Sequence, residues 1–336
     1  MNNNNLPLTL DSNIVEQIGT TLVTGGAGFI GSHVADALTF NNVQVKILDN
    51  LSTGRLSNLA KSRSTKLLKF IKGDLKNSEQ LKIALKNITT VFHIAANPEV
   101  RSGFEKPRPA YDQNIKNTFQ LLEAIRKSKV ECVIFSSSST IYGEPDLIPT
   151  PENFGPLKPI SIYGASKLAC EALLSSFCHS YGFKTLIFRF ANVIGSRGRH
   201  GVIVDFINKL RMNSNKLEIL GDGKQSKSYI HVSDCVNGFF TALSKSTDKL
   251  DIFNVGNDDK IDVMSIARIV CRNMGLQNVK LIPTGGTRDG GGWVGDVKTM
   301  QLNAARLKAL GWKPNFSSSE SVDLACKELL QELAGQ

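Results

Sequence analysis

The sequence of 336 residues lacks any hydrophobic run long enough to cross a membrane. A membrane-spanning helix needs roughly 18 consecutive apolar residues, and no segment approaches that length. Residues 1–13 carry neither the basic stretch nor the apolar stretch of a secretion signal. We therefore expect a cytosolic protein without a membrane partner.

Cysteine spacing typical of a metal site is also missing. The six cysteines form no CxxC pair, and several lie among apolar residues of predicted strands and helices. We therefore expect reduced core cysteines and no bound metal. The six are Cys132, Cys170, Cys178, Cys235, Cys271 and Cys326.

The formal net charge of +10 is not concentrated in any nucleic-acid-binding motif. Lysine and arginine are spread along the chain, without the aromatic stacking pattern that such proteins use. Solubility and attraction of an anionic small molecule explain the charge. We expect no nucleic-acid partner.

The apolar content of 41% supports a large core, and the pattern of short and long segments predicts an α/β fold. Short β-branched runs alternate with helix-length amphipathic stretches, which is typical of a parallel sheet with crossover helices. Helices are predicted over residues 112–127 and 165–180. Six strands are predicted, enough for a doubly wound (Rossmann) sheet: residues 21–24, 43–48, 67–71, 90–95, 132–137 and 185–190.

A glycine-rich segment follows the first predicted strand and opens a helix. Gly25, Gly28 and Gly31 permit a tight turn, a close approach of the backbone to a pyrophosphate, and close helix packing. Asp49 ends the second strand, 18 residues after Gly31, where its carboxylate can accept hydrogen bonds from the adenosine ribose. This carboxylate would repel a 2′-phosphate, so NAD is favoured, whereas Arg55 nearby leaves NADP as the alternative.

Other cofactor contacts are predicted from their places at strand ends, where open sheets bind ligands. Asp74 either meets the adenine amine or caps a helix. Ala95 and Ala96 are small enough for the dinucleotide to lie against the fourth strand, and Asn114 is either a buried polar anchor or an early helix residue. The remaining predicted contacts are Phe29, Ile30, Asn50, Ser52, Thr53, Gly54, Leu75, Ser136 and Phe190.

The segment YGASK places Tyr163 and Lys167 four residues apart, on one face of a helix. Tyrosine, with an ordinary pKa near 10, is a poor base at neutral pH. A cation about 5 Å away at an effective dielectric of about 20 contributes roughly 3 kcal/mol, or about two pKa units. Lys167 and the positive charge of the nicotinamide are therefore expected to lower the pKa of Tyr163 together, with Ser138 sharing the proton of a reacting hydroxyl.

With these motifs the sequence resembles the extended short-chain dehydrogenase/reductase family, and within it the UDP-glucose 4-epimerase (UDP-galactose 4-epimerase) group. The resemblance covers about residues 21 to 314. The matching segments are TGGAGFIG, DNLSTG, GDL, HIAANPEVR, FSSSSTIYG, YGASK, FRFANVIG, GDGKQSKSYIHVSD, FNVGN, GWVGDV and ALGWKP.

The resemblance implies a tightly held NAD that is not consumed and a UDP-sugar substrate. The hydride of sugar carbon 4 passes to NAD while Tyr163, helped by Ser138, takes the hydroxyl proton; the keto sugar then turns over and the hydride returns. Tyr163, Lys167 and Ser138 are the predicted catalytic residues, and Tyr163 and Lys167 are also predicted to contact the cofactor. It assigns UDP-sugar contacts to Ser138, Ser139, Tyr163, Asn192, Gly201, Val202, Lys227, Arg288 and Trp293.

Three departures from the family pattern narrow the chemistry. Lys227 stands where arginine is common, so one bidentate phosphate contact becomes a point charge. Ser139 and Thr140 replace the acidic pair of sugar dehydratases, so dehydration is disfavoured. Trp293 either gates the sugar pocket, which would exclude an N-acetyl group and favour UDP-glucose and UDP-galactose, or anchors the core of the second lobe.

The pattern along the chain divides it into three parts, and the resemblance implies a homodimer built on the helices over residues 112–127 and 165–180. We expect a frayed tail at residues 1–18, an NAD-binding Rossmann domain at 19–190 and a smaller nucleotide-sugar-binding lobe at 191–336, with elements that interleave at the boundary.

Two other interpretations remain. The first is another extended-family enzyme, such as a UDP-glucuronate epimerase or decarboxylase or a sugar dehydratase; Arg101 either meets a sugar carboxylate or has a surface or diphosphate role. A dinucleotide-sensing regulator is possible on the same scaffold, but such proteins usually lack the Tyr163 and Lys167 pair.

Overall fold

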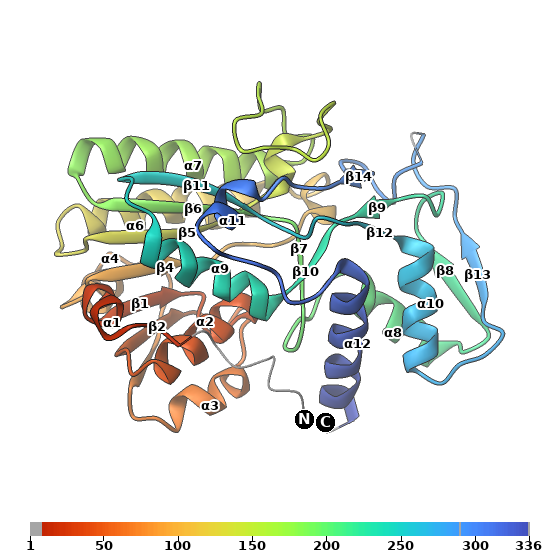
Figure 1. The fold of residues 1–336 in the computed structure, drawn as a ribbon, viewed down its shortest axis with the longest axis horizontal. Coiled ribbons are helices and arrows are strands. Elements are labelled where there is room, and N and C mark those ends of the chain that lie inside the picture. The colour runs from red at the N-terminus through yellow and green to blue at the C-terminus, as the bar shows by residue number, and fades with distance from the viewer. Residues whose placement is uncertain (1–8, 289, 335–336) are drawn as a thin grey trace.

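The computed structural model describes residues 9–288 and 290–334, and a parallel sheet of seven strands forms its centre (Figure 1). The strand order is β11-β6-β5-β4-β1-β2-β3. The strands are β1 (Thr21–Thr24), β2 (Val45–Asp49), β3 (Leu68–Lys72), β4 (Thr90–His93), β5 (Cys132–Ser138), β6 (Lys184–Phe190) and β11 (Leu250–Val255). The six predicted strands and the doubly wound Rossmann class are confirmed.

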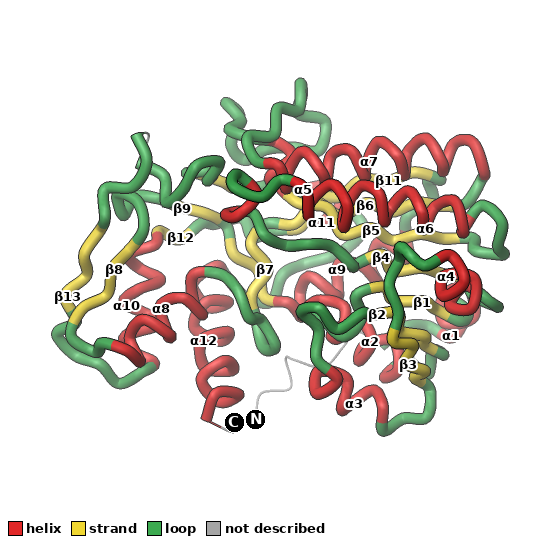
Figure 2. The backbone as a smooth tube through the Cα atoms, turned by 180° about the vertical axis from the view of Figure 1, so that it is seen from behind, coloured by secondary structure: helices red, strands yellow, loops and turns green. Residues whose placement is uncertain are grey.

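Helices cover both faces of this sheet, because successive side chains along its strands are apolar and point to opposite faces. Leu22 and Val23, neighbours in β1, point into two different hydrophobic cores. The helices on the Val23 side are α2 (Phe29–Phe40), α3 (Ala60–Arg63) and α9 (Val232–Lys245). Those on the Leu22 side are α4 (Ser78–Leu85), α6 (Asn117–Ile125) and α7 (Ile162–Tyr181), of which α6 and α7 run side by side (Figure 2).

Both predicted helices are present and lie on the Leu22 side of the sheet, but each begins at a different residue than predicted. The first opens as α5 (Arg108–Ala110) and a π-helical turn (Tyr111–Lys116) that leads directly into α6. The second begins three residues earlier than predicted, because the Ser161 side chain caps α7 by accepting a 3.0 Å hydrogen bond from the Gly164 amide.

The frayed tail expected at residues 1–18 is wrong for its second half. Residues 12–18 form helix α1 (Ser12–Ile18), capped by Asp11. Ile18 is 1% exposed and packs into the core on the Val23 side, so burial of its apolar face holds the helix in place. Residues 1–8 lie outside the described part of the chain.

The second half of the chain builds a smaller lobe around its own core. Its helices are α8 (Val202–Met212), α10 (Val263–Asn273) and α12 (Ser318–Ala334), with the short α11 (Ala305–Ala309) nearer the main sheet. Its short strands are β7 (Asn192–Ile194), β8 (Lys216–Ile219), β9 (Ser226–Lys227), β10 (Tyr229–His231), β12 (Ile261–Asp262), β13 (Lys280–Pro283) and β14 (Thr299–Met300).

The two halves interleave more than a boundary at residue 190 suggests. Helix α9 packs on α2, and strand β11 pairs with β6 as the edge of the main sheet. Strand β11 was not among the six predicted strands, because its segment LDIFNV follows 60 residues of irregular pattern. No local feature of the segment shows which sheet it joins. The second half therefore completes the Rossmann sheet as well as forming the smaller lobe.

Candidate active site

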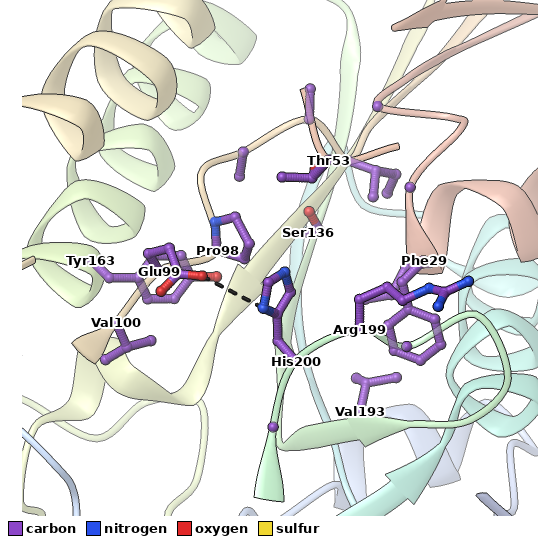
Figure 3. Close-up of a pocket in the computed structure, with 18 of the residues that line it drawn as sticks. Phe29, Thr53, Pro98, Glu99, Val100, Ser136, Tyr163, Val193, Arg199 and His200 are labelled. Carbon is purple, nitrogen blue, oxygen red and sulfur yellow. Dashed lines mark ion pairs between the residues drawn. The ribbon is translucent and has the colours of Figure 1, made fainter. Parts of the chain in front are cut away.

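One cavity of about 1180 Å³ opens at the carboxyl ends of the main strands and reaches into the smaller lobe. Sites for one small ligand are typically about 300–1,000 Å³, so this volume leaves room for a dinucleotide and a second ligand. Phe29 and Arg199 lie on one side of the cavity and Tyr163 on the other, with Glu99 and His200 between them (Figure 3).

The glycine loop between β1 and α2 forms a cradle that side chains would fill. Gly25 has a φ of 67°, and a Cβ there would lie 2.7 Å from the Cα of Ala95. A Cβ at Gly31 would collide with the carbonyl oxygen of Gly25. Helix α2 begins after Gly28, whose lack of a side chain leaves the first backbone N–H groups open to an anion. The residues present therefore fit a dinucleotide pyrophosphate.

Asp49 ends β2 beside this cradle and is held in a fixed orientation. Its Oδ2 accepts a 2.9 Å hydrogen bond from the Ala27 amide, and its Oδ1 accepts a 2.7 Å bond from the Leu51 amide. The carboxylate lines the cavity, whereas Arg55 is exposed and is not among the lining residues. This arrangement supports NAD rather than NADP.

Asp74 also lines the cavity, and helix capping is not its role. Asn77 caps α4, whereas Asp74 accepts hydrogen bonds from the Lys76 amide and the Asn50 side chain. Burial opposes ionisation of Asp74, but these hydrogen bonds and the Lys76 charge prevail and lower its pKa. The carboxylate therefore stays ionised beside the cofactor cradle.

Most of the predicted cofactor contacts meet in this cavity. The lining includes Gly25, Gly28, Phe29, Ile30, Gly31, Asp49, Asn50, Ser52, Thr53, Asp74, Leu75, Ala95, Ala96, Ser136, Tyr163, Lys167 and Phe190. Gly54 does not line it, because it packs against the backbone of Ala27. Asn114 does not line it either: it accepts a 2.7 Å hydrogen bond from the Asn97 amide and donates a 2.8 Å bond to Ser166 Oγ. Asn114 is thus a buried polar anchor.

Tyr163 and Lys167 project from the first turns of α7, next to the end of β5. Lys167 is 2% exposed, and its Nζ donates a 2.6 Å hydrogen bond to the carbonyl oxygen of Ser136. The same Nζ lies 5.8 Å from the centre of the Tyr163 ring. Ser138, at the end of β5, lies close enough to Tyr163 to lower the pKa of its hydroxyl, so the three predicted catalytic residues meet at one place.

Burial is the main influence on the pKa values of Tyr163 and Lys167. Burial raises the pKa of Tyr163 above its ordinary value, the Cys170 thiol adds to the rise, and the hydrogen bond to Ser138 opposes it. Burial also lowers the pKa of Lys167 to about 8. The expected lowering of the Tyr163 pKa by Lys167 together with the nicotinamide charge concerns the cofactor-bound protein and stays a prediction; in the chain alone, burial dominates the pKa of both groups.

A buried ion pair supports the strand that carries Ser138. Arg189 in β6 and Glu171 in α7 form a 2.8 Å salt bridge with both side chains almost fully buried. The Ser137 hydroxyl donates a 2.5 Å hydrogen bond to Glu171, and Arg189 also donates to the Tyr142 hydroxyl. This network links β5, β6 and α7 directly behind the catalytic trio.

The expected UDP-sugar contacts are only partly brought together. Asn192, Gly201, Val202, Lys227 and Trp293 line the same cavity as Tyr163. Ser138 does not line the cavity but lies beside Tyr163, which does. Ser139 is buried outside the lining. Arg288 is exposed and also lies outside the lining, because the glycine-rich loop directs it to solvent. Arg288 is therefore not placed to grip a diphosphate in this structure.

Lys227 and Trp293 lie together at the far end of the cavity. Lys227 Nζ lies 5.6 Å from the Trp293 ring centre and donates a 2.6 Å bond to Asp296. Asp296 also accepts a 2.9 Å bond from the Gly292 amide, which fixes the glycine-rich loop next to the lysine. The tryptophan thus belongs to the cavity wall, with its ring beside a cation.

Several lining residues were missed by the sequence analysis. Arg197, Arg199 and His200 form a basic stretch immediately before Gly201, and this run of charges was the available signal. The buried pair of Glu171 and Arg189 was also missed, although an arginine inside the apolar strand TLIFRF is itself unusual.

The remaining expectations concern cysteines, metals and membranes. All six cysteines are free and buried, as predicted. Within residues 9–288 and 290–334, no cluster of histidine, cysteine and acidic side chains is arranged to hold a metal ion. No helix in the same part of the chain combines the length and apolarity that a membrane crossing requires.

The dinucleotide cradle and Tyr163 of helix α7 line one cavity, which also reaches into the smaller lobe. This arrangement is that of an extended short-chain dehydrogenase/reductase. The chain belongs to the NAD dependent epimerase/dehydratase family, whose model matches residues 21–256. It is an NAD-dependent nucleotide-sugar epimerase.

Known proteins of this kind match the chain over nearly its whole length. The UDP-glucose 4-epimerase of Mycolicibacterium smegmatis is 30% identical over 310 residues, which cover 90% of this chain and 96% of that enzyme. A crystal structure of a UDP-galactose 4-epimerase is 41% identical with a TM-score of 0.83, covering 94% of this chain and 99% of the other. The UDP-N-acetylglucosamine 4-epimerase of Methanobrevibacter ruminantium, in complex with UDP-N-acetylmuramic acid, is 30% identical with the same TM-score and the same coverage.

Proposed function

We propose that this protein interconverts UDP-glucose and UDP-galactose through a transient 4-keto sugar. The observation that carries the proposal is the meeting of Tyr163, Ser138 and Lys167 at the cofactor side of a cavity large enough for two ligands. The cavity continues from this point to Lys227 and Trp293, which gives a nucleotide diphosphate a place beyond the sugar.

When held in the glycine cradle, NAD would supply a hydride acceptor for sugar carbon 4 and, once reduced, a hydride donor for the 4-keto sugar. As the C4–H bond breaks and the C4=O bond forms, the hydroxyl proton moves through Ser138 to the Tyr163 oxygen. The reverse transfer restores the hydroxyl with the opposite configuration. Lys167 keeps a positive charge near the ring of Tyr163 and favours the phenolate that takes the proton.

The two residues that follow Ser138 in the chain favour epimerisation over loss of water. Ser139 is buried and Thr140 donates a 3.0 Å hydrogen bond to Ser138 Oγ. Neither is a carboxylate that can remove and return protons at carbons 5 and 6. A dehydratase function is therefore not supported by these residues.

The sugar itself is the part of the proposal that an assay must decide. A direct test incubates the purified protein separately with UDP-glucose, UDP-galactose, UDP-N-acetylglucosamine and UDP-glucuronate, separates the products by chromatography and follows NADH absorbance. We expect the two hexoses to interconvert with no net NADH. Preferred turnover of UDP-N-acetylglucosamine or UDP-glucuronate, or release of a keto-deoxy sugar, would refute the assignment.

We also propose that the protein is a homodimer that joins through α6 and α7. Four large apolar side chains, Tyr111, Phe119, Ile162 and Tyr181, are exposed along these helices. The ring of Phe177 lies between those of Phe119 and Tyr181, at 5.9 Å and 5.1 Å, so the aromatic strip is continuous. Sedimentation at micromolar concentration tests this: Phe119→Glu should yield a monomer, and a monomeric wild type contradicts the proposal.

A further inference from the structure

Half of the unpaired buried polar atoms belong to the active-site cavity. Within residues 9–288 and 290–334, eight buried side-chain nitrogen or oxygen atoms have no hydrogen-bond partner. Four of them are on residues that line the cavity: Arg197 Nη1, Arg199 Nε, Gln225 Oε1 and Trp293 Nε1. Buried polar groups are nearly always paired, so these atoms mark places where a ligand completes the hydrogen bonding.

The two arginines lie on a loop that is tied firmly to both halves of the protein. The loop follows β7, and its Ser196 carbonyl meets His33 Nε2 of α2 at 3.1 Å. Arg197 Nη2 donates a 2.6 Å bond to Asp36 of α2, and its amide donates to the carboxylate of Glu332 in α12. Arg197 has a φ of 64°, a left-handed conformation that is strained for this residue and is held by these contacts.

The tied loop delivers Arg199 to the start of α2. Arg199 lies beside Phe29, the first residue of that helix (Figure 3). A Cβ at Gly198 would lie 4.0 Å from Cζ of the Phe29 ring, so the loop packs against the side chain of this first helical residue. Tyr163 is on the opposite side of the cavity in the same view. Arg199 is therefore at the cofactor end of the cavity and away from the reacting sugar carbon.

The charges at this end require an anion. The N-terminus of α2 carries open N–H groups and a partial positive charge, and Arg199 adds a full positive charge beside the first residue of this helix. Two positive groups facing each other repel until an anion lies between them. The guanidinium is planar and presents parallel donors that match phosphate oxygens.

We propose that Arg199 anchors NAD by donating hydrogen bonds to its pyrophosphate from the side opposite the glycine loop. The dinucleotide is then held between the Rossmann half and a loop of the second half. This inference rests on the proposed function only through the cofactor, and it holds whichever sugar is the substrate.

The test compares Arg199→Gln and Arg199→Lys with Arg211→Gln, an exposed arginine of α8. NAD retained after exhaustive dialysis is quantified by chromatography, and the rise in melting temperature on adding NAD gives the affinity. UDP binding is followed by tryptophan fluorescence, since Trp293 lines the cavity and Trp312 is buried in the core.

We expect Arg199→Gln to weaken NAD binding at least about tenfold, Arg199→Lys to fall between it and the wild type, and UDP affinity to stay unchanged. Arg211→Gln should match the wild type in both. Unchanged NAD affinity in Arg199→Gln overturns the proposal, as does a loss of UDP binding in place of NAD binding, which would assign Arg199 to the substrate. Each result stands even if no hexose is turned over, so it is separate from the test of the sugar.

Discussion

Lys167 Nζ donates a 2.6 Å hydrogen bond to the carbonyl oxygen of Ser136, and this bond fixes α7 against the end of β5. The catalytic tyrosine lies one turn before the lysine, and the catalytic serine lies two residues after the carbonyl. One hydrogen bond between the two elements thus sets the distance between the proposed base and its proton partner.

Replacing the proposed base should remove activity and leave binding intact. Tyr163→Phe keeps the ring but loses the hydroxyl, so turnover should fall by about 10²–10⁴-fold, the range of a general base. NAD retention and UDP binding should match the wild type. Tyr181→Phe, at the exposed end of α7, is the matched control and should keep full turnover. A Tyr163→Phe enzyme with wild-type turnover would show that Tyr163 is not the base.

Trp293 should control which sugars are accepted. Its ring is part of the cavity wall, and removing it in Trp293→Ala enlarges the space available to a sugar substituent. We expect the ratio of turnover on UDP-N-acetylglucosamine to turnover on UDP-galactose to rise at least about tenfold in the variant. Competition assays with both substrates measure the ratio. If the wild type already turns over the N-acetyl sugar efficiently, Trp293 does not exclude it.

Asp49 should determine the choice of dinucleotide. Asp49→Asn keeps the shape of the side chain and removes the charge that repels a 2′-phosphate. NAD affinity should fall about tenfold while NADP affinity rises, because a neutral amide accepts ribose hydrogen bonds less well. Calorimetric titration with each dinucleotide provides the measurement, and Asp248→Asn, at an exposed position, is the control. An unchanged preference would place the selectivity elsewhere.

The ion pair of Glu171 and Arg189 should matter most when only one partner is lost. Glu171→Gln leaves the Arg189 charge buried without its counter-charge, so the free energy of unfolding should drop by about 3–5 kcal/mol. The double variant Glu171→Leu with Arg189→Met should recover part of that loss. Urea denaturation of both variants at pH 7 measures the difference. A double variant less stable than Glu171→Gln would contradict this account.

His93 should make the protein sensitive to acid. Its ring nitrogens contact Thr24 Oγ1 at 2.8 Å and Thr118 Oγ1 at 2.9 Å, and burial together with the Lys167 charge lowers its pKa to about 3. The unfolded chain takes up a proton at His93 as the pH falls through 6.5, whereas the folded protein does not until about pH 3. The free energy of unfolding should therefore fall between these pH values, by at most about 1.4 kcal/mol per pH unit from this group.

The matched comparison for His93 is Gln, which keeps hydrogen-bonding atoms but does not titrate. Urea midpoints at pH 5 and pH 7 should differ less in His93→Gln than in the wild type. His179→Gln, on the exposed side of α7, should keep the full difference. Equal pH dependence in all three proteins would rule out His93 as its source.

Most of the fold, and the glycine loop expected to hold the cofactor, could be predicted from short sequence patterns. The glycines, Asp49 and the six strands could be predicted because each is recognised from the residues of one short segment. Strand β11 and helix α1 were not, since their places depend on burial against distant segments: β11 pairs with β6, and Ile18 packs into a core built by later helices.

The grouping of Tyr163, Lys167 and Ser138 could be predicted from the sequence, whereas the pKa shifts of Tyr163 and Lys167 could not. Spacing alone shows that Tyr163 and Lys167 share a helix face, whereas their pKa values depend on how completely the surrounding residues exclude water. Arg288 and Arg199 show the same limit for binding residues. Both are arginines near glycines, and only the three-dimensional course of the loops directs one to solvent and the other into the cavity.

Strand β11 has a consequence for any attempt to divide this enzyme. A chain cut after residue 190 would leave β6 as an open edge with unpaired backbone groups and apolar side chains, which invites aggregation. The second half of the chain is therefore not a detachable module that can be exchanged between enzymes of different specificity. Changes of substrate in this scaffold are better sought by single substitutions in the cavity wall than by grafting the second half of the chain.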